Sequence, residues 1–494
     1  MIRNKFSLSH TKLLSCDAGE LIPVTWFEVL PGDSIQQSTS FLVRAAALLA
    51  PVMHPVSVRV HHWFVPYRII WAHFERFITG GADGMDATAY PTRNAGTVTA
   101  GGLSDYLGIP PVGAPVVSDL PFRAYQMIWN EWYRDQDLET AAAVNTGNGL
   151  NNTTDSTLKN CSWEKDYFTS ARPWPQKGPA VTLPLGTSAP VVYNDASTNP
   201  WLVKRSDNNA IQAGITDALQ ALNTSGFLNK AGQTTAKLDP NGGLLADLST
   251  ATSVNITTFR EALALQRYEE ARARYGSRYP EYLAYLGVRS SDGRLQRPEY
   301  LGGGKQTLQF SEVLQTGVTT SGNTAGVGNL RGHGIAAMRS NRYRRFFEEH
   351  GLVMSLMSIR PKTIYMQGLH RSWNRRTKDD FWQKEFEHIG QQEILNKEIY
   401  STHSSPDGTW GYQDRYDEYR RMESSVAGEF RSTLNFWHMA REFGSEPALN
   451  ASFVKSVPTE RTFAVPSEDV YYVHANHSIQ ARRLVSKTGT SFTF

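Results

Sequence analysis

LIPVTWFEVLPGDS (residues 21–34) and VSVRVHHWF (residues 56–64) are the stretches that decide the fold. The first is a short, mostly apolar run closed by the turn tripeptide Pro-Gly-Asp, as is typical of a strand end. The second alternates between two faces, with valines on one face and Ser57, Arg59 and His61 on the other. This alternation is the pattern of a half-buried antiparallel strand, although Trp63 breaks it.

Further strands are predicted along the rest of the chain. Residues 352–359 are a nearly continuous apolar run ended by Arg-Pro, which indicates a strand buried on both faces. Residues 181–185, 461–465 and 470–474 are also extended candidates. Many short strands, long polar loops and few helices predict a mainly β protein, an eight-stranded antiparallel jelly roll with long loop insertions.

Three helices are expected. Asp119 can cap a helix that has Pro121 in its first turn and aromatic residues at helical spacing up to Tyr133. Thr258 and Glu261 form a capping-box pattern for a second helix, which Gly276 ends. Residues 378–400 are predicted to form a third, broken near Gly390.

Composition favours a soluble, packed protein. The chain is 40% hydrophobic and 11% aromatic, which suffices for a sizeable core, and we expect one elaborated domain. No secretory signal or membrane span is visible, because charged residues and proline interrupt the most apolar run, residues 41–60. Cys16 and Cys161 are too few and too far apart for a disulfide scaffold or a zinc site, so no metal and no cofactor is expected.

Short blocks of sequence, taken together and in order, identify a family. The N-terminal blocks are FSLSH (6–10), LIPV (21–24), EVLPGD (28–33), VRAAALLAPVMH (43–54), FVPYRIIW (64–71) and FITGG (77–81). Later blocks are LPFRAYQMIWNEWYRDQ (120–136), KDYFTSARPWPQKG (165–178), RYPEYL (278–283), QRPEYLGGG (296–304), EHGLVMSLMSIRP (349–361), IGQQEI (389–394), YDEYR (416–420) and GEFRSTLNFWHMAREF (428–443). Together they resemble the major capsid protein of the microviruses, the small single-stranded DNA bacteriophages, especially the gokushovirus-like branch.

The resemblance implies a structural protein rather than an enzyme. A microvirus coat subunit folds as a jelly roll and assembles into a T=1 icosahedral shell of sixty identical copies around a circular single-stranded DNA genome. The expected partners are further copies of the chain, the DNA, a small basic internal virion protein and a receptor on the host cell surface. The expected location is the virion, after assembly in the cytoplasm of the host bacterium.

Residues 186–255 match no block of the family and are rich in Asn, Thr, Ser, Ala and Gly. A polar segment of this length faces solvent or carries function. We therefore expect a jelly-roll domain formed by residues 1–185 and 256–494, with residues 186–255 as a surface protrusion. In relatives the longest insertion forms an external protrusion thought to meet the host, which suggests the same role here.

A basic stretch offers the best functional evidence outside the resemblance. Residues 331–378 hold eleven Lys or Arg residues against two Glu, in a chain of net charge +3. Guanidinium groups neutralise phosphates and aromatic faces stack unpaired bases, so the arginines and tryptophan of two aromatic-rich segments are candidate contacts for single-stranded DNA. These residues are Arg342, Arg344, Arg345, Arg371, Trp373, Arg375 and Arg376. In the alternative interpretation, the same arginines pair with carboxylates of neighbouring subunits or cover strand edges.

Arg482 and Arg483 form a second basic cluster near the C-terminus, together with Lys487. They are further candidates for contact with the genome, although three cations also suit an ordinary surface. Residues 415–421 mix Arg, Asp, Glu and Tyr so evenly that an ion-pair network between subunits is favoured there over nucleic-acid contact.

Two other classes of function compete with the capsid hypothesis. A jelly roll with aromatic loops could be a lectin-like carbohydrate-binding protein or a glycan hydrolase, with Glu131 and Asp135 as acid and base. A nuclease would need a cluster of metal-binding carboxylates or histidines, and none is apparent. His61 and His62 should point to opposite faces of a strand and cannot share a metal ion. The glycine run before Lys305 lacks the first glycine and the Ser or Thr of a P-loop, so no catalytic residue is assigned.

Overall fold

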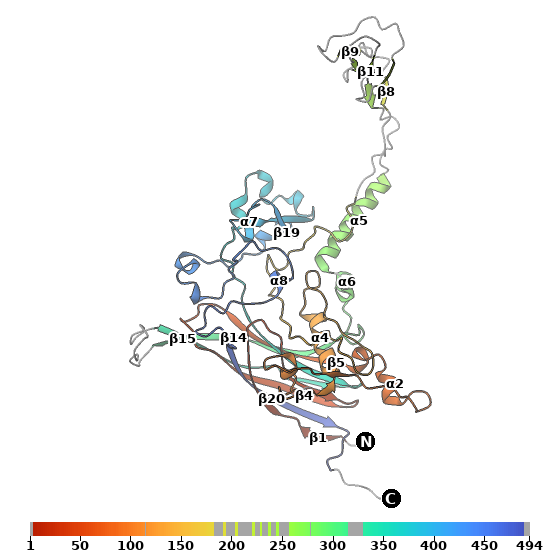
Figure 1. Cartoon of the computed structure of the whole chain (residues 1–494), viewed down its shortest axis with the longest axis vertical. Helices are drawn as coiled ribbons and strands as arrows, with labels where there is room; N and C mark the ends of the chain where they lie inside the picture. Colours follow the sequence, from red (N-terminus) through yellow and green to blue (C-terminus); the bar gives the residue numbers. More distant parts are fainter. Residues whose placement is uncertain are drawn as a thin grey trace. The chain divides into compact units, whose positions relative to one another are not determined.

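The computed structural model describes residues 3–113, 115–181, 256–276, 278–314 and 330–488, together with the backbone of six short strands between residues 191 and 246 (Figure 1). The chain divides into two compact units. The first unit comprises Met1–Lys177 and Glu270–Phe494, and the second comprises Gly178–Glu269. Most of the predicted protrusion, residues 186–255, lies outside the described residues.

The first unit is built on antiparallel strands in two sheets that share one strand. Sheet 1 has the order β1/β2, β20, β4, β15/β16, and sheet 2 has the order β3, β17, β5, β14. The strands of sheet 1 are β1 (Asn4–Ser7), β2 (His10–Cys16), β4 (Ser34–Ala45), β15 (Leu330–Arg339), β16 (Tyr343–Phe346) and β20 (Tyr471–Arg483). The strands of sheet 2 are β3 (Ile22–Val29), β5 (Val56–Pro66), β14 (Glu299–Leu314) and β17 (Gly351–Pro361).

This order is that of a jelly roll, as predicted. Ten strand segments fill eight positions, because β1 and β2 share one position beside β20, and β15 and β16 share another beside β4. Strand β14 joins the sheets: its first part pairs with β5 up to Leu308, and its second part pairs with β15 from Gln309.

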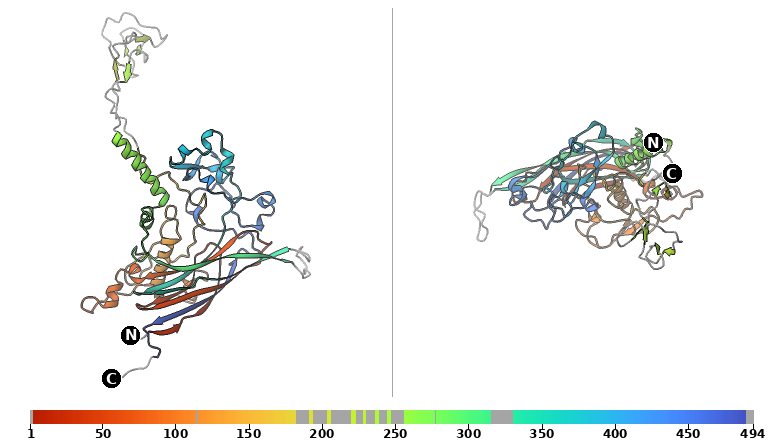
Figure 2. Two further views of the ribbon diagram at one scale, coloured as in Figure 1. Left: turned by 180° about the vertical axis from the view of Figure 1, so that it is seen from behind. Right: turned by 90° about the horizontal axis from the view of Figure 1, so that it is seen from above.

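The remaining elements lie in long connections between the strands, and Figure 2 shows several of these connections gathered on one side of the strands. The helices are α1 (Tyr67–Ile70), α2 (Phe74–Thr79), α3 (Leu103–Tyr106), α4 (Leu120–Trp132), α5 (Ile256–Tyr275), α6 (Tyr279–Tyr285), α7 (Asn396–Ile399) and α8 (Ala451–Val454). The short strands are β6 (Thr92–Asn94) with β7 (Val116–Ser118), β18 (Gln391–Leu395) with β19 (Thr409–Asp414), and, in the second unit, β8 (Val191–Tyr193), β9 (Val203–Arg205), β10 (Gln220–Leu222), β11 (Leu228–Asn229), β12 (Ala236–Leu238) and β13 (Leu244–Ala246).

The central strands of sheet 2, β5 and β17, are covered on both faces. Toward sheet 1, the alternating valines of β5 pack with Met357 and Ile359 of β17 and with Phe41 and Val43 of β4. On the other face, Leu352, Met354 and Leu356 of β17 pack against α4. The prediction of a strand buried on both faces is therefore confirmed. Trp63 breaks the simple alternation because this second face of β5 is also covered.

The two cysteines lie in different cores. Cys16 is buried between the sheets and Cys161 beneath the cover of sheet 2, and both are free thiols. Burial raises the pKa of each thiol above its ordinary value. Neither cysteine therefore carries a reactive thiolate.

The helix predicted after Asp119 is confirmed as α4, but Asp119 does not cap it through its side chain. Its buried carboxylate instead pairs with Arg123 at 2.6 Å and with Arg93 at 3.2 Å. The helix predicted from Thr258 begins slightly earlier, at Ile256, and ends before Gly276, whose φ of +105° suits only glycine.

The helix predicted over residues 378–400 is wrong. That segment contains the 3-10 turns η2 (Lys378–Asp380) and η3 (Lys384–Phe386), then strand β18 and the short helix α7. Pairing of β18 with β19 outweighs the local helical spacing, and Gly390 takes a φ of +120° just before the strand. Residues 461–465 form no strand, with a single bridge at Phe463, whereas the strand predicted at 470–474 is the start of β20. The candidate strand at 181–185 lies almost wholly outside the described residues.

A buried polar network links the two sheets. His62 of β5 hydrogen-bonds through Nδ1 to Ser355 Oγ at 2.7 Å and through Nε2 to Ser340 Oγ at 3.1 Å. Gln37 of β4 donates to the same Ser355 oxygen, and Tyr343 donates to Gln37. Burial lowers the pKa of His62 to about 3, with a smaller contribution from His61, so the ring is neutral in the folded protein.

This neutral histidine predicts acid sensitivity. A histidine of the unfolded chain titrates near pH 6.5, so below that pH the unfolded chain binds a proton that folded His62 refuses. Its contribution to stability is complete above about pH 6.5 and is lost progressively toward pH 3, by about 1.4 kcal/mol per pH unit. His62→Gln should flatten the dependence of the unfolding free energy on pH by that amount. Urea unfolding between pH 7 and pH 4 measures it, and an unchanged slope would refute the assignment.

Candidate nucleic-acid interface

The outer face of sheet 1 carries exposed cations on neighbouring strands. In the strand register, Arg482 of β20 lies opposite Lys5 of β1 on one side and opposite Ser34 of β4 on the other. Ser34 in turn lies opposite Phe346 of β16. Because directly opposed residues lie on the same face of a sheet, this row faces outward together. Arg344 lies in the adjacent outward row, opposite Gln36.

Arg44, Arg339 and Arg342 extend the same surface. Arg339 pairs with Ser40 of β4, and the guanidinium of Arg342 lies 3.2 Å from the Gln36 side-chain amide. We call this surface the basic sheet face, and its cations are Lys5, Arg44, Arg339, Arg342, Arg344 and Arg482, all exposed.

The basic sheet face has no compensating acid. Strands β1, β2, β4, β15, β16 and β20 contain no Asp or Glu, and Glu312 of the shared strand β14 lies opposite Gly332, on the other face of the sheet. Within the described residues none of the six cations forms an ion pair. The exposed rings of Tyr472 and Phe346 lie among the cations. Unpaired guanidinium groups beside open aromatic rings are the chemistry that binds phosphates and stacks unpaired bases.

Two predicted site residues lie on the same strands but are already paired. Arg345 Nη2 forms an ion pair with Glu299 Oε2 of β14 at 2.9 Å. Arg483 Nε lies 2.9 Å from Asp33 Oδ2 and donates from Nη2 to the Glu28 carbonyl. Within the subunit these two arginines therefore link structural elements of the jelly roll.

The candidates at 371–376 form a separate loop cluster, Arg371, Trp373, Arg375 and Arg376, at the 3-10 turn η1 (Arg371–Asn374). Arg371 Nη1 binds buried Glu398 Oε1 at 2.8 Å, and Arg375 Nη2 lies 3.6 Å from Glu418 Oε1. Trp373 is 69% exposed. Arg376 donates to two nearby backbone carbonyls. Most of the charge in this cluster is therefore neutralised within the subunit.

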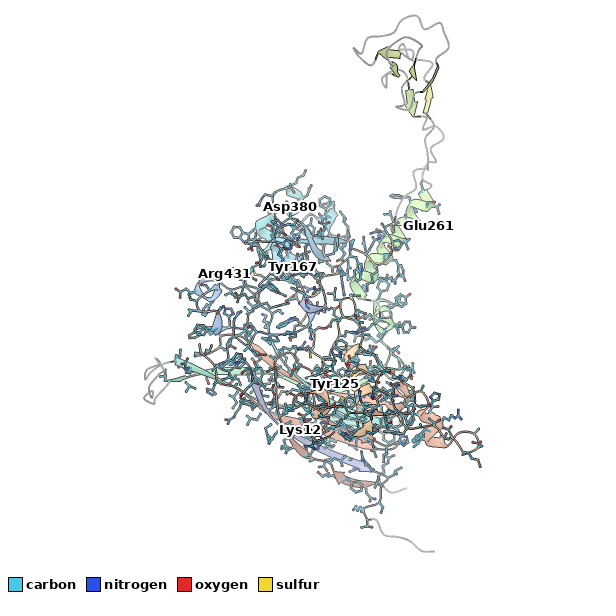
Figure 3. All side chains as sticks on the ribbon, viewed as in Figure 1. Lys12, Tyr125, Tyr167, Glu261, Asp380 and Arg431 are labelled. Atoms are coloured by element: carbon cyan, nitrogen blue, oxygen red, sulfur yellow. The ribbon has the colours of Figure 1, made fainter. Side chains whose placement is uncertain are left out.

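The structure does not bring the two groups of candidates together. Figure 3 labels Asp380, which accepts from the Arg376 backbone at 2.8 Å, on one side of the first unit, and Lys12 of β2 on the opposite side, among the strands of sheet 1. Arg342, Arg344 and Arg482 thus share one surface, and the loop cluster occupies another. The basic stretch seen in the sequence is two different sites in space.

Sequence reasoning missed Lys5, Arg44 and Arg339 as site residues. They are scattered over strands far apart in the chain, and only the register of the sheet places them beside Arg482 and Arg344. The signal that could have identified them is the absence of Asp and Glu from strands β1, β2, β4, β15, β16 and β20.

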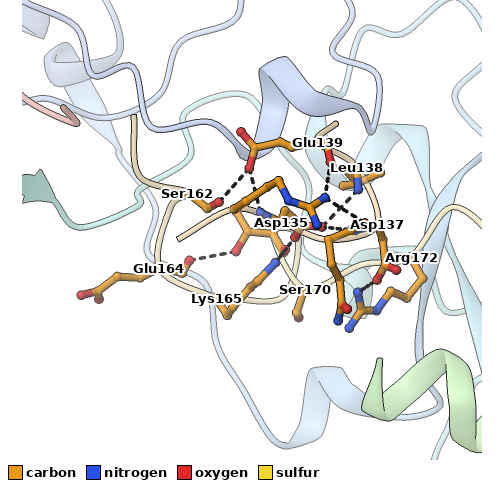
Figure 4. Close-up of polar contacts among 12 residues, drawn as sticks. Asp135, Asp137, Leu138, Glu139, Ser162, Glu164, Lys165, Ser170 and Arg172 are labelled. Atoms are coloured by element: carbon orange, nitrogen blue, oxygen red, sulfur yellow. Dashed lines mark hydrogen bonds and ion pairs between the residues drawn. The ribbon is translucent and has the colours of Figure 1, made fainter. Parts of the chain in front are cut away.

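The carboxylates considered for a glycan hydrolase do not form an acid and base pair. Helix α4 ends at Trp132, and Asp135 lies beyond it in a polar turn shown in Figure 4. Burial opposes ionisation of Asp135, but Lys165 and the Asp137 N–H outweigh it, so the pKa of Asp135 is lowered. A general acid needs the opposite shift. Over the part of the chain that the structure describes, no group of His, Cys, Asp and Glu could hold a metal ion.

Comparison with known proteins gives consistent matches. A family model described as capsid protein (F protein) matches residues 1–493. Capsid protein VP1 of Bdellovibrio phage phiMH2K is 39% identical over 487 residues, which cover 94% of this chain and 90% of the relative. Capsid proteins VP1 of Chlamydia phage 1 and of Spiroplasma virus 4 are each 32% identical, again over 94% of this chain and over 91% and 90% of the relatives.

The buried ion pairs of the loop cluster predict a large difference between two neighbouring arginines. Arg371→Ala would leave Glu398 buried without its cation, which typically costs about 3–5 kcal/mol of unfolding free energy. Arg376→Ala removes an exposed charge that has no carboxylate partner among the described side chains, and should cost no more than about 0.5 kcal/mol. Urea unfolding of the isolated subunit measures both, and equal effects would contradict the structural role of Arg371.

Proposed function

Because the chain belongs to the capsid protein (F protein) family, that of the microvirus major capsid proteins, we propose that sixty copies form a T=1 icosahedral shell around a circular single-stranded DNA genome. The protein is a bacteriophage capsid protein, a structural part of the virion that assembles with other subunits into a shell. In the proposal it catalyses no reaction.

The observation that supports DNA binding is the basic sheet face. In the first unit, inserted segments cover the central strands of sheet 2, whereas the outer face of sheet 1 is basic and has no such cover among the described residues. A shell that encloses DNA needs such a surface on its inside, because cations that replace counterions hold the phosphates. We infer that the basic sheet face lines the interior.

The dependence of DNA affinity on salt concentration should test whether the basic sheet face binds phosphates. Replacing Arg342, Arg344 and Arg482 together with Ala removes three phosphate contacts, and each should reduce the slope of log affinity against log salt by about 0.7 for a single strand. Titration of the purified subunit with a labelled oligonucleotide at several salt concentrations measures the slope. Genome content per particle should fall while shells still form.

Arg345→Ala is the matched control. Arg345 neighbours Arg344 on β16 but is paired with Glu299, so its loss should leave the salt slope unchanged. If the triple variant lost shells and packaged DNA equally, the basic sheet face would be a contact between subunits and the DNA assignment would be wrong.

Further partners belong to the same proposal. Six cations on the lining of each subunit are few for an enclosed genome, so a small basic internal protein would supply additional positive charge. Assembly would take place in the cytoplasm of the host bacterium. Within the described residues, no helix has the length and apolarity to span a bilayer.

The polar insertion, residues 186–255, is proposed to contact the host cell surface. Its support is its composition, because a long polar segment without matching blocks is expected at the surface. Deleting residues 188–249 should leave shells intact and reduce adsorption to host cells, as measured by electron microscopy and by a binding assay with labelled particles. Loss of assembly would overturn this role.

A further inference from the structure

One strand edge of the jelly roll has no partner strand among the described residues. Residues 309–314 of β14 pair with β15 along one edge, but β5 begins only opposite Leu308, so no described strand lies along the second edge. Among the described residues, no backbone hydrogen bond or bridge reaches it. Figures 1 and 2 show the paired ends of β14 and β15 extending beyond the other strands.

The other outer strands of the two sheets are protected. Strand β3 contains Pro23 and is covered by α3. The segment after α3 is held there by a hydrogen bond that Trp26 Nε1 donates to the Leu107 carbonyl. Strands β1 and β2 are interrupted between Ser7 and His10 and carry lysines, and β16 carries two arginines. Short strands, charges and proline are the usual devices that keep sheet edges from pairing with other chains.

Residues 309–314 have almost none of this protection. Their sequence, QFSEVL, contains one acid, no Lys or Arg and no proline. Val313 is 44% exposed and Leu314 is 56% exposed. A free edge with exposed apolar side chains is a template for an added strand, because main-chain hydrogen bonds supply affinity and side chains supply specificity.

We propose that an extended segment of a second copy of this chain adds to this edge in the assembled shell. The occupant is a second copy because the family assembles into a multi-subunit shell, and because residues 309–314 of β14 and 330–334 of β15 continue sheet 1 past the end of its pairing with β4. A subunit placed beside the sheet would meet this edge first. This placement rests on the proposed function, which puts the basic sheet face on the inside. Each subunit then offers its edge to the next in a heterologous contact, as ring closure requires.

Hydrogen exchange tests the proposal on the unmodified protein. DNA-free shells and dissociated subunits are compared by mass spectrometry for a peptide covering residues 308–314. Edge pairing protects amides that are otherwise open to solvent, so exchange there should slow by about tenfold or more in shells. A peptide within β20, which is paired on both sides, should be protected in both states. Equal exchange of residues 308–314 in shells and subunits would overturn the proposal.

Two lysine substitutions on the same outward face separate the strand edge from the rest of that face. Val313→Lys charges the free edge and should reduce the yield of shells by about tenfold or more without changing the thermal midpoint of the subunit. Leu13→Lys adds a lysine at a 75% exposed position on the outward face of β2, within the proposed lining, and should leave assembly intact. Normal assembly of Val313→Lys would refute the edge contact. Blocked assembly of Leu13→Lys would refute the interior position of the basic sheet face. The edge contact would then be decided by whether residues 308–314 exchange more slowly in shells than in subunits.

Discussion

The arrangement of this protein depends on the requirement that the central strands of sheet 2, β5 and β17, be buried on both faces. These two strands carry large apolar side chains in both directions, so one face packs on sheet 1 and the other must be covered by the chain itself. The long connection between β5 and β14 supplies that cover through α4 and the segments around it. The outer face of sheet 1 lacks such a cover among the described residues, and its polar and basic character follows from that exposure.

The two arginine groups show how the same residue type serves opposite purposes. In the loop cluster, Arg371 and Arg375 are matched by the buried carboxylates Glu398 and Glu418, and their loss would leave charges uncompensated inside the protein. On the basic sheet face the strands contain no carboxylate, so the cations remain available to an external polyanion. Residues 342–345 and 371–376 are similar in composition. They differ in whether carboxylates from other parts of the chain lie beside the arginines.

Sequence predicted the features that depend on local pattern. The alternation of β5, the apolar run of β17 and the helical spacing of α4 were sufficient, because each pattern has one stable solution when a face is buried. The segment at 378–400 was mispredicted because pairing between β18 and β19 decides its structure, and that partner is distant in sequence. Asp119 was expected to cap a helix, yet its carboxylate forms ion pairs with two arginines, one of them from β6. The basic sheet face itself could not be predicted, since it arises from strand register across residues from Lys5 to Arg482.

The two buried cysteines have a consequence for the life of the particle. The chain contains no other thiol, and both sulfur atoms are held in apolar cores as protonated, unreactive groups. Disulfide bonds between folded subunits would need these thiols at the surface, so the subunits of the shell are held together by non-covalent contacts. Thiol–disulfide exchange then contributes neither to the cohesion of the particle nor to its disassembly.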